Sequence, residues 1–296
     1  MKEKPFSKYQ ILSNGTMIIV TIMVIIPFLL LFMSSITDEQ VLVANGYSFW
    51  PEKFSLASYQ YIIKSGEQII NAYGISIFVT LLGTLINILL SALMAYPLTV
   101  KSLPGRKILL FFVFFTMLFN GGIVPSYIMW SSTFHIKDTI WAQLLPNFLL
   151  SAWNVMMIRT YFQTSIPDSL YEAARIDGAS EFTIFSKVVI PLGKPILVTM
   201  GTFAGLTYWN DWTNGLYYIV RERDLYNIQN LLNQIASNIQ YLAQSSDSNV
   251  SSAAATIPST GIQMAIAFVA ILPIMLIFPL FQKYYSKGIT LGGVKG

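Results

Sequence analysis

The residues of this chain whose spacing most suggests a function lie in a charged island between two long apolar stretches, from Glu172 to Pro191. Three consecutive residues, Glu172, Ala173 and Ala174, are followed after three further residues by Gly178. Glycine adopts the left-handed backbone conformation that ends many helices without steric cost. The spacing therefore predicts a helix that carries Glu172 and turns at Gly178.

Two serines and a proline mark the expected limits of a helix–turn–helix loop. Ser169 and Glu172 have the S-x-x-E spacing of a capping box, which would start the first helix just after Pro167 and Asp168. Ser180 can cap a second helix, and Pro191 is expected near the end of that helix.

The residue types in this loop favour the docking of another protein. At helical spacing Ala173, Ala174 and Asp177 fall near one another, and small alanines let another protein approach closely. Glu172 adds a charged anchor. The alternative is an ordinary cytoplasmic loop in which Glu172 only caps a helix.

A second group with chemical potential is Trp209-Asn210-Asp211-Trp212, which interrupts an apolar stretch. Indole faces can stack on the C–H surface of a sugar, while amide and carboxylate groups bond its hydroxyls. Aromatic belts at membrane interfaces give the same composition, so both interpretations stay open. On a continuous helix Trp209 and Trp212 would share a face, whereas Asp211 would point elsewhere.

Two more polar residues, Asn120 and Asn154, lie in apolar stretches. Such amides either line a cavity or bond across neighbouring helices. We carry both as candidate substrate contacts alongside residues 209–212.

The composition excludes several classes of protein. The chain has no cysteine, and no nucleophile–base pair, metal-ligand cluster or cofactor fingerprint is evident in its sequence. It lacks the G-x-x-x-x-G-K-[ST] pattern of a P-loop. We therefore expect no catalytic residues, no metal and no cofactor, and any ATP must be hydrolysed by a partner.

The balance of residue types predicts an all-α membrane protein. Hydrophobic residues make up 54% of the chain and charged residues 11%, and the mean hydropathy is +0.58. Long stretches poor in charge predict six transmembrane helices, at roughly 15–36, 72–100, 108–130, 141–160, 196–219 and 261–285.

The placement of lysine and arginine predicts the orientation. With the N-terminus inside, thirteen of the eighteen basic residues fall in cytoplasmic segments and five outside. Both termini and the 161–195 loop are then cytoplasmic, and 38–70 and 221–260 are external loops. Leucines and isoleucines from Leu225 to Leu242 recur at helical spacing and predict an amphipathic helix there. The net charge of +4 expresses this bias and calls for no nucleic acid.

The charged island resembles the EAA motif of ABC importer permeases, in which Glu-Ala-Ala, a glycine and a final proline stand at these distances. Val188 and Ile190 replace the isoleucine and leucine of that pattern and keep its apolar character. The resemblance implies that a cytosolic ATPase docks on this loop. It assigns the coupling to Glu172, Ala173, Ala174, Asp177, Gly178 and Pro191.

Further segments resemble carbohydrate-importer permeases, namely residues 71–107, DTIWAQLLP, FNGGIVPSY, YWNDW and the terminal TLGGVKG. The similarity is to the smaller six-span subunit of the maltose-type pair, in the branch that imports complex oligosaccharides. It implies one transmembrane permease domain over residues 1–296 in a prokaryotic cell membrane, surrounded by lipid. It also implies a second six-span permease, two ATPase copies and an extracellular or periplasmic solute-binding protein.

A different class, an ion-gradient-driven secondary transporter or channel subunit, is the alternative. Such a protein is expected to place several ionisable residues at mid-membrane depth. In this chain Asp211 is the one candidate.

Overall fold

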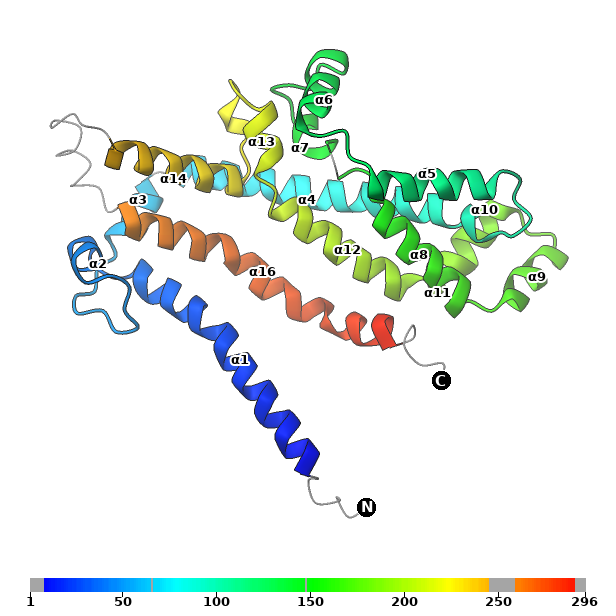
Figure 1. Cartoon of the computed structure of the whole chain (residues 1–296), viewed down its shortest axis with the longest axis horizontal. Coiled ribbons are helices and arrows are strands. Elements are labelled where there is room, and N and C mark those ends of the chain that lie inside the picture. Colours follow the sequence, from blue (N-terminus) through cyan, green and yellow to red (C-terminus); the bar gives the residue numbers. More distant parts are fainter. Residues whose placement is uncertain (1–7, 65, 147, 245–258, 291–296) are drawn as a thin grey trace. The chain divides into compact units, whose positions relative to one another are not determined.

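The computed structural model describes residues 8–64, 66–146, 148–244 and 259–290 (Figure 1). Their regular structure is helical, and the one strand-like pairing among them is an isolated bridge between Thr37 and Phe54. Part of the predicted external segment 221–260, the terminal TLGGVKG and the first lysines lie outside the described residues. The chain divides into two compact units, one of 1–69 with 232–273 and one of 70–231 with 274–296.

The first unit contains the long apolar helix α1 and the ends of helices that continue into the second unit. Its elements are α1 (Lys8–Ser35), α2 (Glu39–Asn45), α3 (Ala57–Lys64), the first turn of α4 (Gly66–Ala95), most of α14 (Ile228–Gln244) and the first half of α16 (Ser259–Thr290). The Glu39 carboxylate accepts the backbone N–H groups of Thr260 at 2.9 Å and Gly261 at 2.8 Å. It thereby caps the start of α16, whose first N–H groups have no partner within the helix. Phe32 packs on Phe268 with ring centroids 4.9 Å apart.

The second unit contains the remaining helices, which are short except for α4. They are η1 (Pro97–Thr99), α5 (Arg106–Leu118), α6 (Ile123–Ile128), η2 (Met129–Thr133), α7 (Trp141–Leu144), α8 (Ala152–Ser165), α9 (Asp168–Ile176), α10 (Glu181–Ile184), η3 (Phe185–Val189), α11 (Ile190–Leu192), α12 (Lys194–Trp209), α13 (Thr213–Tyr218) and η4 (Arg223–Leu225). Figure 1 shows α12 and α8 running beside α4.

Glycines allow α4 and α12 to pack closely. Gly205 lies near Thr84 and Thr80 of α4, and a Cβ at Gly83 would overlap the Tyr208 ring. A separate apolar core joins α8, α12 and the segment 181–192. Ile158, Phe162, Ile184 and Val189 are fully buried in that core, so the charged island is anchored to the membrane helices by its second half.

Three helices are long and apolar enough to cross a membrane alone: Tyr9–Ser35, Gly66–Thr99 and Thr260–Ile277. Two bent pairs also qualify together, Arg106–Leu118 with Ile123–Thr133 at 112° and Glu181–Leu192 with Lys194–Trp209 at 78°. The described residues therefore offer up to five candidate spans if each bent pair counts as one.

Three of the six transmembrane helices predicted from the sequence are interrupted in the structure, so the prediction of continuous helices is wrong there. The 108–130 helix ends at Leu118, before the turn at Gly122, whose φ is +86°. The 141–160 helix is two pieces, α7 and α8, because Pro146 cannot continue a helix and Ser151 caps a new one. The 196–219 helix stops at Trp209, because the Asp211 side chain bonds the first N–H groups of α13.

Candidate functional site

The charged island folds as a helix–turn–helix, in agreement with its spacing. Gly178 has φ +75°, so the left-handed turn is confirmed, and the Ser180 hydroxyl accepts the Thr183 N–H at 3.2 Å, which confirms the second cap. Pro191 stands in α11, just before the bend into α12, as predicted. The capping box is wrong: α9 begins at Asp168 with Pro167 before it, so Ser169 lies inside the helix. Pro167 has the extended backbone that precedes a helix but no side-chain acceptor, so the first N–H groups of α9 receive no side-chain cap from it.

The first helix of the loop packs few side chains against the rest of the described chain. No residue of α9 is buried, and Glu172, Ala173 and Asp177 are exposed. Two apolar side chains of the loop are also exposed, Ile176 of α9 at 85% and Phe182 of α10 at 72%. Exposed apolar groups beside charges are typical of a surface that receives a partner.

Glu181, which the sequence analysis did not single out, joins the loop to Tyr96, the residue that follows α4. Its Oε2 accepts the Tyr96 hydroxyl at 2.5 Å, and its Oε1 accepts Arg175 Nε at 3.1 Å. The hydrogen bond to Glu181 raises the pKa of the Arg175 guanidinium. Tyr96 is buried and packs on Phe185 at 5.4 Å and on Tyr171 at 6.5 Å. No local sequence signal identifies this contact, because Tyr96 and Glu181 are 85 residues apart.

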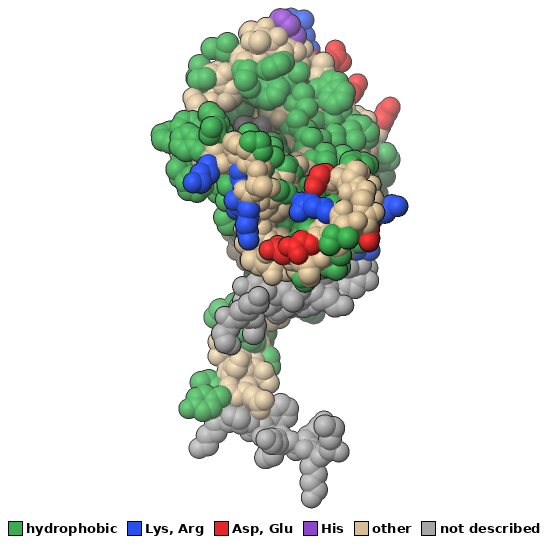
Figure 2. All heavy atoms as spheres, turned by 90° about the vertical axis from the view of Figure 1, so that its right-hand side faces the viewer, with side chains coloured by type: hydrophobic (Ala, Val, Ile, Leu, Met, Phe, Trp, Pro, Cys, Tyr) green, Lys and Arg blue, Asp and Glu red, His purple; other side chains and the backbone are tan. Residues whose placement is uncertain are grey.

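A cleft of about 590 Å³ lies beside the loop, between residues 99–106 and α9. Arg106 and Arg159 both donate through Nε to the Leu98 carbonyl, at 2.9 and 3.0 Å. Lys101 lies 3.7 Å from Asp168 across the cleft. Figure 2 shows acidic and basic side chains gathered on this face of the molecule, next to apolar side chains.

The second group predicted from sequence, residues 209–212, does not form one surface. Trp209 and Asp211 are buried at 6% exposure, whereas Asn210 is exposed and Trp212 is 43% exposed. The helix needed for a shared indole face ends at Trp209, so that geometric expectation is wrong. Trp209 packs on Tyr73 of α4 with centroids 6.3 Å apart.

Asp211 organises the break between α12 and α13. Its Oδ1 accepts the Thr213 hydroxyl at 2.7 Å and the Thr213 N–H at 3.0 Å. Its backbone carbonyl accepts Asn227 Nδ2 at 2.7 Å. The buried amides of Gln143, Asn214 and Asn230 extend this network, which the sequence analysis did not foresee.

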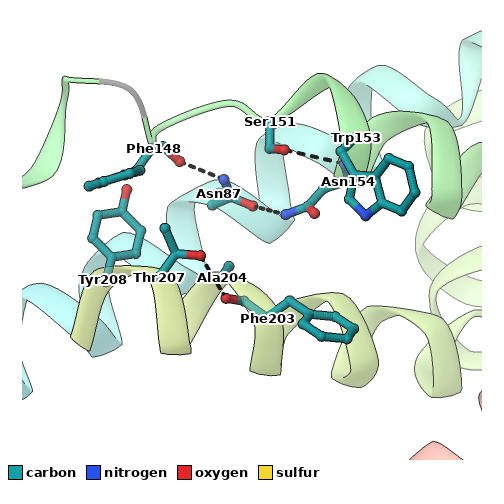
Figure 3. A pocket seen from close by; sticks show the side chains of 9 residues that line it. All are labelled: Asn87, Phe148, Ser151, Trp153, Asn154, Phe203, Ala204, Thr207 and Tyr208. Atoms are coloured by element: carbon teal, nitrogen blue, oxygen red, sulfur yellow. Dashed lines mark hydrogen bonds between the residues drawn. The ribbon is translucent and has the colours of Figure 1, made fainter. Parts of the chain in front are cut away.

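The two isolated asparagines have different surroundings. Asn120 is exposed, and its Oδ1 accepts the Gly122 N–H at 2.8 Å. Asn154 is buried and donates to Asn87 Oδ1 of α4 at 2.8 Å. Asn154 also lines a cavity of about 310 Å³ between α4, α8 and α12 (Figure 3). Among the described residues, no cluster of three or more potential metal ligands occurs.

Long apolar helices, two bent helix pairs that could each span a membrane and an exposed helix–turn–helix loop together define a helical membrane protein. Comparison with known proteins makes this specific. Residues 69–291 match the family described as binding-protein-dependent transport system inner membrane component, and the chain belongs to that family. It is therefore the membrane subunit of a binding-protein-dependent ABC importer, and ATP hydrolysis belongs to a separate subunit.

Individual relatives cover nearly the whole chain. The polygalacturonan/rhamnogalacturonan transport system permease protein YtcP of Bacillus subtilis (strain 168) is 35% identical over 97% of this chain and 98% of its own length. The arabinooligosaccharides transport system permease protein AraQ of the same organism is 26% identical over 98% of each. A solved structure, a bacterial ABC transporter involved in the import of the acidic polysaccharide alginate, matches with a TM-score of 0.79 and 25% identity. That match covers 95% of this chain and 100% of that one.

Proposed function

We propose that this chain forms half of the translocation pathway of an ATP-driven oligosaccharide importer and couples it to the ATPase through the 161–195 loop. The observation that carries the coupling assignment is the loop's geometry: an exposed helix, a glycine turn at φ +75° and a second helix anchored in the core. An exposed first half can receive a partner, and an anchored second half can pass its movement to the membrane helices.

The printed names of the relatives support an oligosaccharide as the substrate. One of them names polygalacturonan and rhamnogalacturonan, another names arabinooligosaccharides, and the structural match concerns alginate. The ion-gradient alternative receives no support from these comparisons.

The proposed assembly contains this chain, a second six-span permease, two ATPase copies and a solute-binding protein. Residues 1–296 form one permease domain with six spans and both termini in the cytoplasm. In that arrangement α8 and the α12–α13 pair serve as interrupted spans. The segments 38–70 and 221–260 face outward and receive the binding protein, and the amphipathic helix α14 lies in the second of them.

Charge reversal tests the coupling assignment. Glu172→Lys is expected to reduce co-purification of the ATPase by roughly tenfold, because one anchor becomes repulsive. The matched control is Glu222→Lys, an exposed glutamate in the proposed external segment, which should leave ATPase binding unchanged. Equal ATPase recovery with Glu172→Lys and wild type would contradict the coupling role.

A further inference from the structure

We propose that the cavity between α4, α8 and α12 binds one sugar ring of the transported oligosaccharide. Trp153 and Phe203 are its aromatic walls, and Asn154 and Thr207 are its hydrogen-bonding partners for hydroxyl groups. This inference rests on the proposed function, because it takes the substrate to be a sugar and residues 161–195 to be cytoplasmic.

The first argument comes from the length of α8. Its 14 residues reach about 21 Å at 1.5 Å per residue, which is less than the roughly 30 Å of a bilayer core. Because α8 ends at Ser165, near the cytoplasmic loop, its first residue lies within the membrane. Non-helical backbone at that depth occurs only where it is buried in protein or lines a cavity. The segment before α8 meets this condition at the cavity.

The second argument is that side chains from three helices bond three carbonyl groups just before α8, those of Leu144, Pro146 and Phe148. The Tyr208 hydroxyl donates to the Leu144 carbonyl at 3.0 Å, and Asn214 Nδ2 donates to the Pro146 carbonyl at 3.1 Å. Asn87 Nδ2 donates to the Phe148 carbonyl at 2.6 Å. The cavity wall is therefore fixed before any ligand arrives, which lowers the ordering cost of binding.

The two aromatic side chains that line the cavity are each about half exposed. Trp153 is 54% exposed and Phe203 is 48% exposed. In Figure 3 the Trp153 ring extends from α8 and the Phe203 ring from α12, at the same end of the pocket. Aromatic rings facing lipid would need no polar groups beside them, whereas here they border the buried Asn87–Asn154 pair. An apolar wall beside a polar floor matches the two kinds of surface on a pyranose ring.

The polar floor retains capacity for hydroxyl groups. Asn154 uses Nδ2 for Asn87, so its Oδ1 can accept a hydrogen bond from a ligand. Thr207 donates its hydroxyl hydrogen to the Phe203 carbonyl at 3.0 Å and keeps its oxygen as an acceptor. None of the described lining residues is charged. At about 310 Å³ the cavity is at the lower end of the roughly 300–1,000 Å³ typical of small-ligand sites, which suits one ring rather than a chain of them.

The experiment uses the complete importer in proteoliposomes, with radiolabelled galacturonate trisaccharide and arabinotriose as probes. Trp153→Ala and Phe203→Ala are each expected to reduce uptake of the transported probe about fivefold to tenfold. Trp153→Phe should restore most of the loss, because it keeps an aromatic face. Trp141→Ala is the matched control, since Trp141 is 50% exposed and lies outside the cavity.

A labelling measurement separates sugar contact from a general defect. Because the chain has no cysteine, Thr207→Cys introduces a single thiol into it. Saturating probe should slow its reaction with a maleimide at least threefold, and should leave a thiol at Thr133→Cys unaffected.

Each outcome decides between the two proposals. Normal uptake by both alanine variants, with no protection at position 207, would overturn the sugar site and leave the importer assignment standing. Uptake of neither probe by the wild-type complex would contradict the oligosaccharide assignment and the sugar site with it.

Discussion

The turn at residues 177–180 and the break at residues 210–212 both interrupt helices, yet the chain treats them in opposite ways. Around the turn, no residue of α9 is buried, and the reversal at Gly178 is supported mainly by the half-exposed ion pair between Arg175 and Glu181. Around the break, Asp211, Asn214, Asn227 and Asn230 are all buried and bonded to one another or to nearby backbone. The polar groups of the break are mostly bonded inside the protein, apart from Asp211 Oδ2, which is buried without a hydrogen-bond partner among the described residues. Beside the turn, Glu172 and Asp177 are exposed and remain available to a partner.

This difference predicts two kinds of defect. Changes at the break at residues 210–212 should lower the stability of the protein, and transport activity should fall only as folded protein is lost. Changes at the turn should leave the amount of folded protein unchanged while uncoupling ATP hydrolysis from uptake.

The largest effect is expected for Asn227→Leu. It removes the donor to the Asp211 carbonyl and the acceptor of the Asn230 N–H, and leaves both groups unpaired in the interior. The cost is about 3 kcal/mol, since each unsatisfied buried group costs about 1–3 kcal/mol. Thermal unfolding of the purified complex measures it, with Asn233→Leu on the same helix as the control. An unchanged unfolding midpoint would show that the network is not structural.

The second-largest effect is expected for Gly178→Val, on uptake. A β-branched residue is disfavoured at φ +75°. The exposed turn is expected to relieve this strain by distorting locally, so uptake should fall about tenfold while the unfolding midpoint changes little. Gly178→Asn is the control, because asparagine tolerates the left-handed region. Uptake and ATP hydrolysis are measured together with the unfolding midpoint. A loss of stability as large as that of Asn227→Leu would erase the distinction between the two regions.

A smaller effect is expected for Glu181→Gln. The neutral amide can still bond Tyr96, but it loses the ion pair with Arg175. In that pair the Arg175 side chain is 43% exposed and the Glu181 side chain is 58% exposed. Exposed pairs contribute less than about 1 kcal/mol, so sugar carried per ATP should fall only about twofold. Glu222→Gln serves as the control. If hydrolysis and uptake decline in the same proportion, Glu181 has no role in coupling.

The smallest effect is expected on the pH dependence of stability, through the carboxyl group of Asp138. The N–H groups of Arg221, at 2.8 Å, and Val220, at 2.6 Å, bond Asp138 Oδ1 and hold the pKa of that carboxyl below its usual range. Because the folded pKa is lowered, the stabilisation is present above the unfolded value, about 3.9, and is lost as pH falls through the folded value. Asp138→Asn should reduce the difference in unfolding midpoint between pH 6 and pH 3 by about 1 °C. An identical pH profile would exclude this contribution.

The sequence predicted what local chemistry determines. Gly178, Ser180 and Pro191 were placed correctly because turns, caps and helix ends depend on a few neighbouring residues. The capping box failed because α9 already begins at Asp168, with Pro167 in the cap position, which leaves Ser169 inside the helix. The contacts of Glu181 with Tyr96, and of Asn87 with Phe148, join residues 85 and 61 positions apart, which no local pattern encodes.

The residues with the most suggestive chemistry were also the hardest to assign. Trp209 and Asp211 have the composition of a sugar site but are buried in the structure. The sequence pattern does not distinguish Trp153 and Phe203 as site residues, because single aromatic residues in apolar helices are common. Only the three-dimensional arrangement separates an aromatic residue beside a polar floor from one that faces lipid.

The absence of charge among the described residues that line the cavity has an electrical consequence. A sodium ion or a proton that entered there would leave its hydration shell without meeting a counter-charge, which is costly in a medium of low dielectric constant. A sugar, whose hydroxyl groups exchange one set of hydrogen bonds for another, meets a far lower barrier. Such a passage can carry nutrient inward while the membrane keeps its voltage.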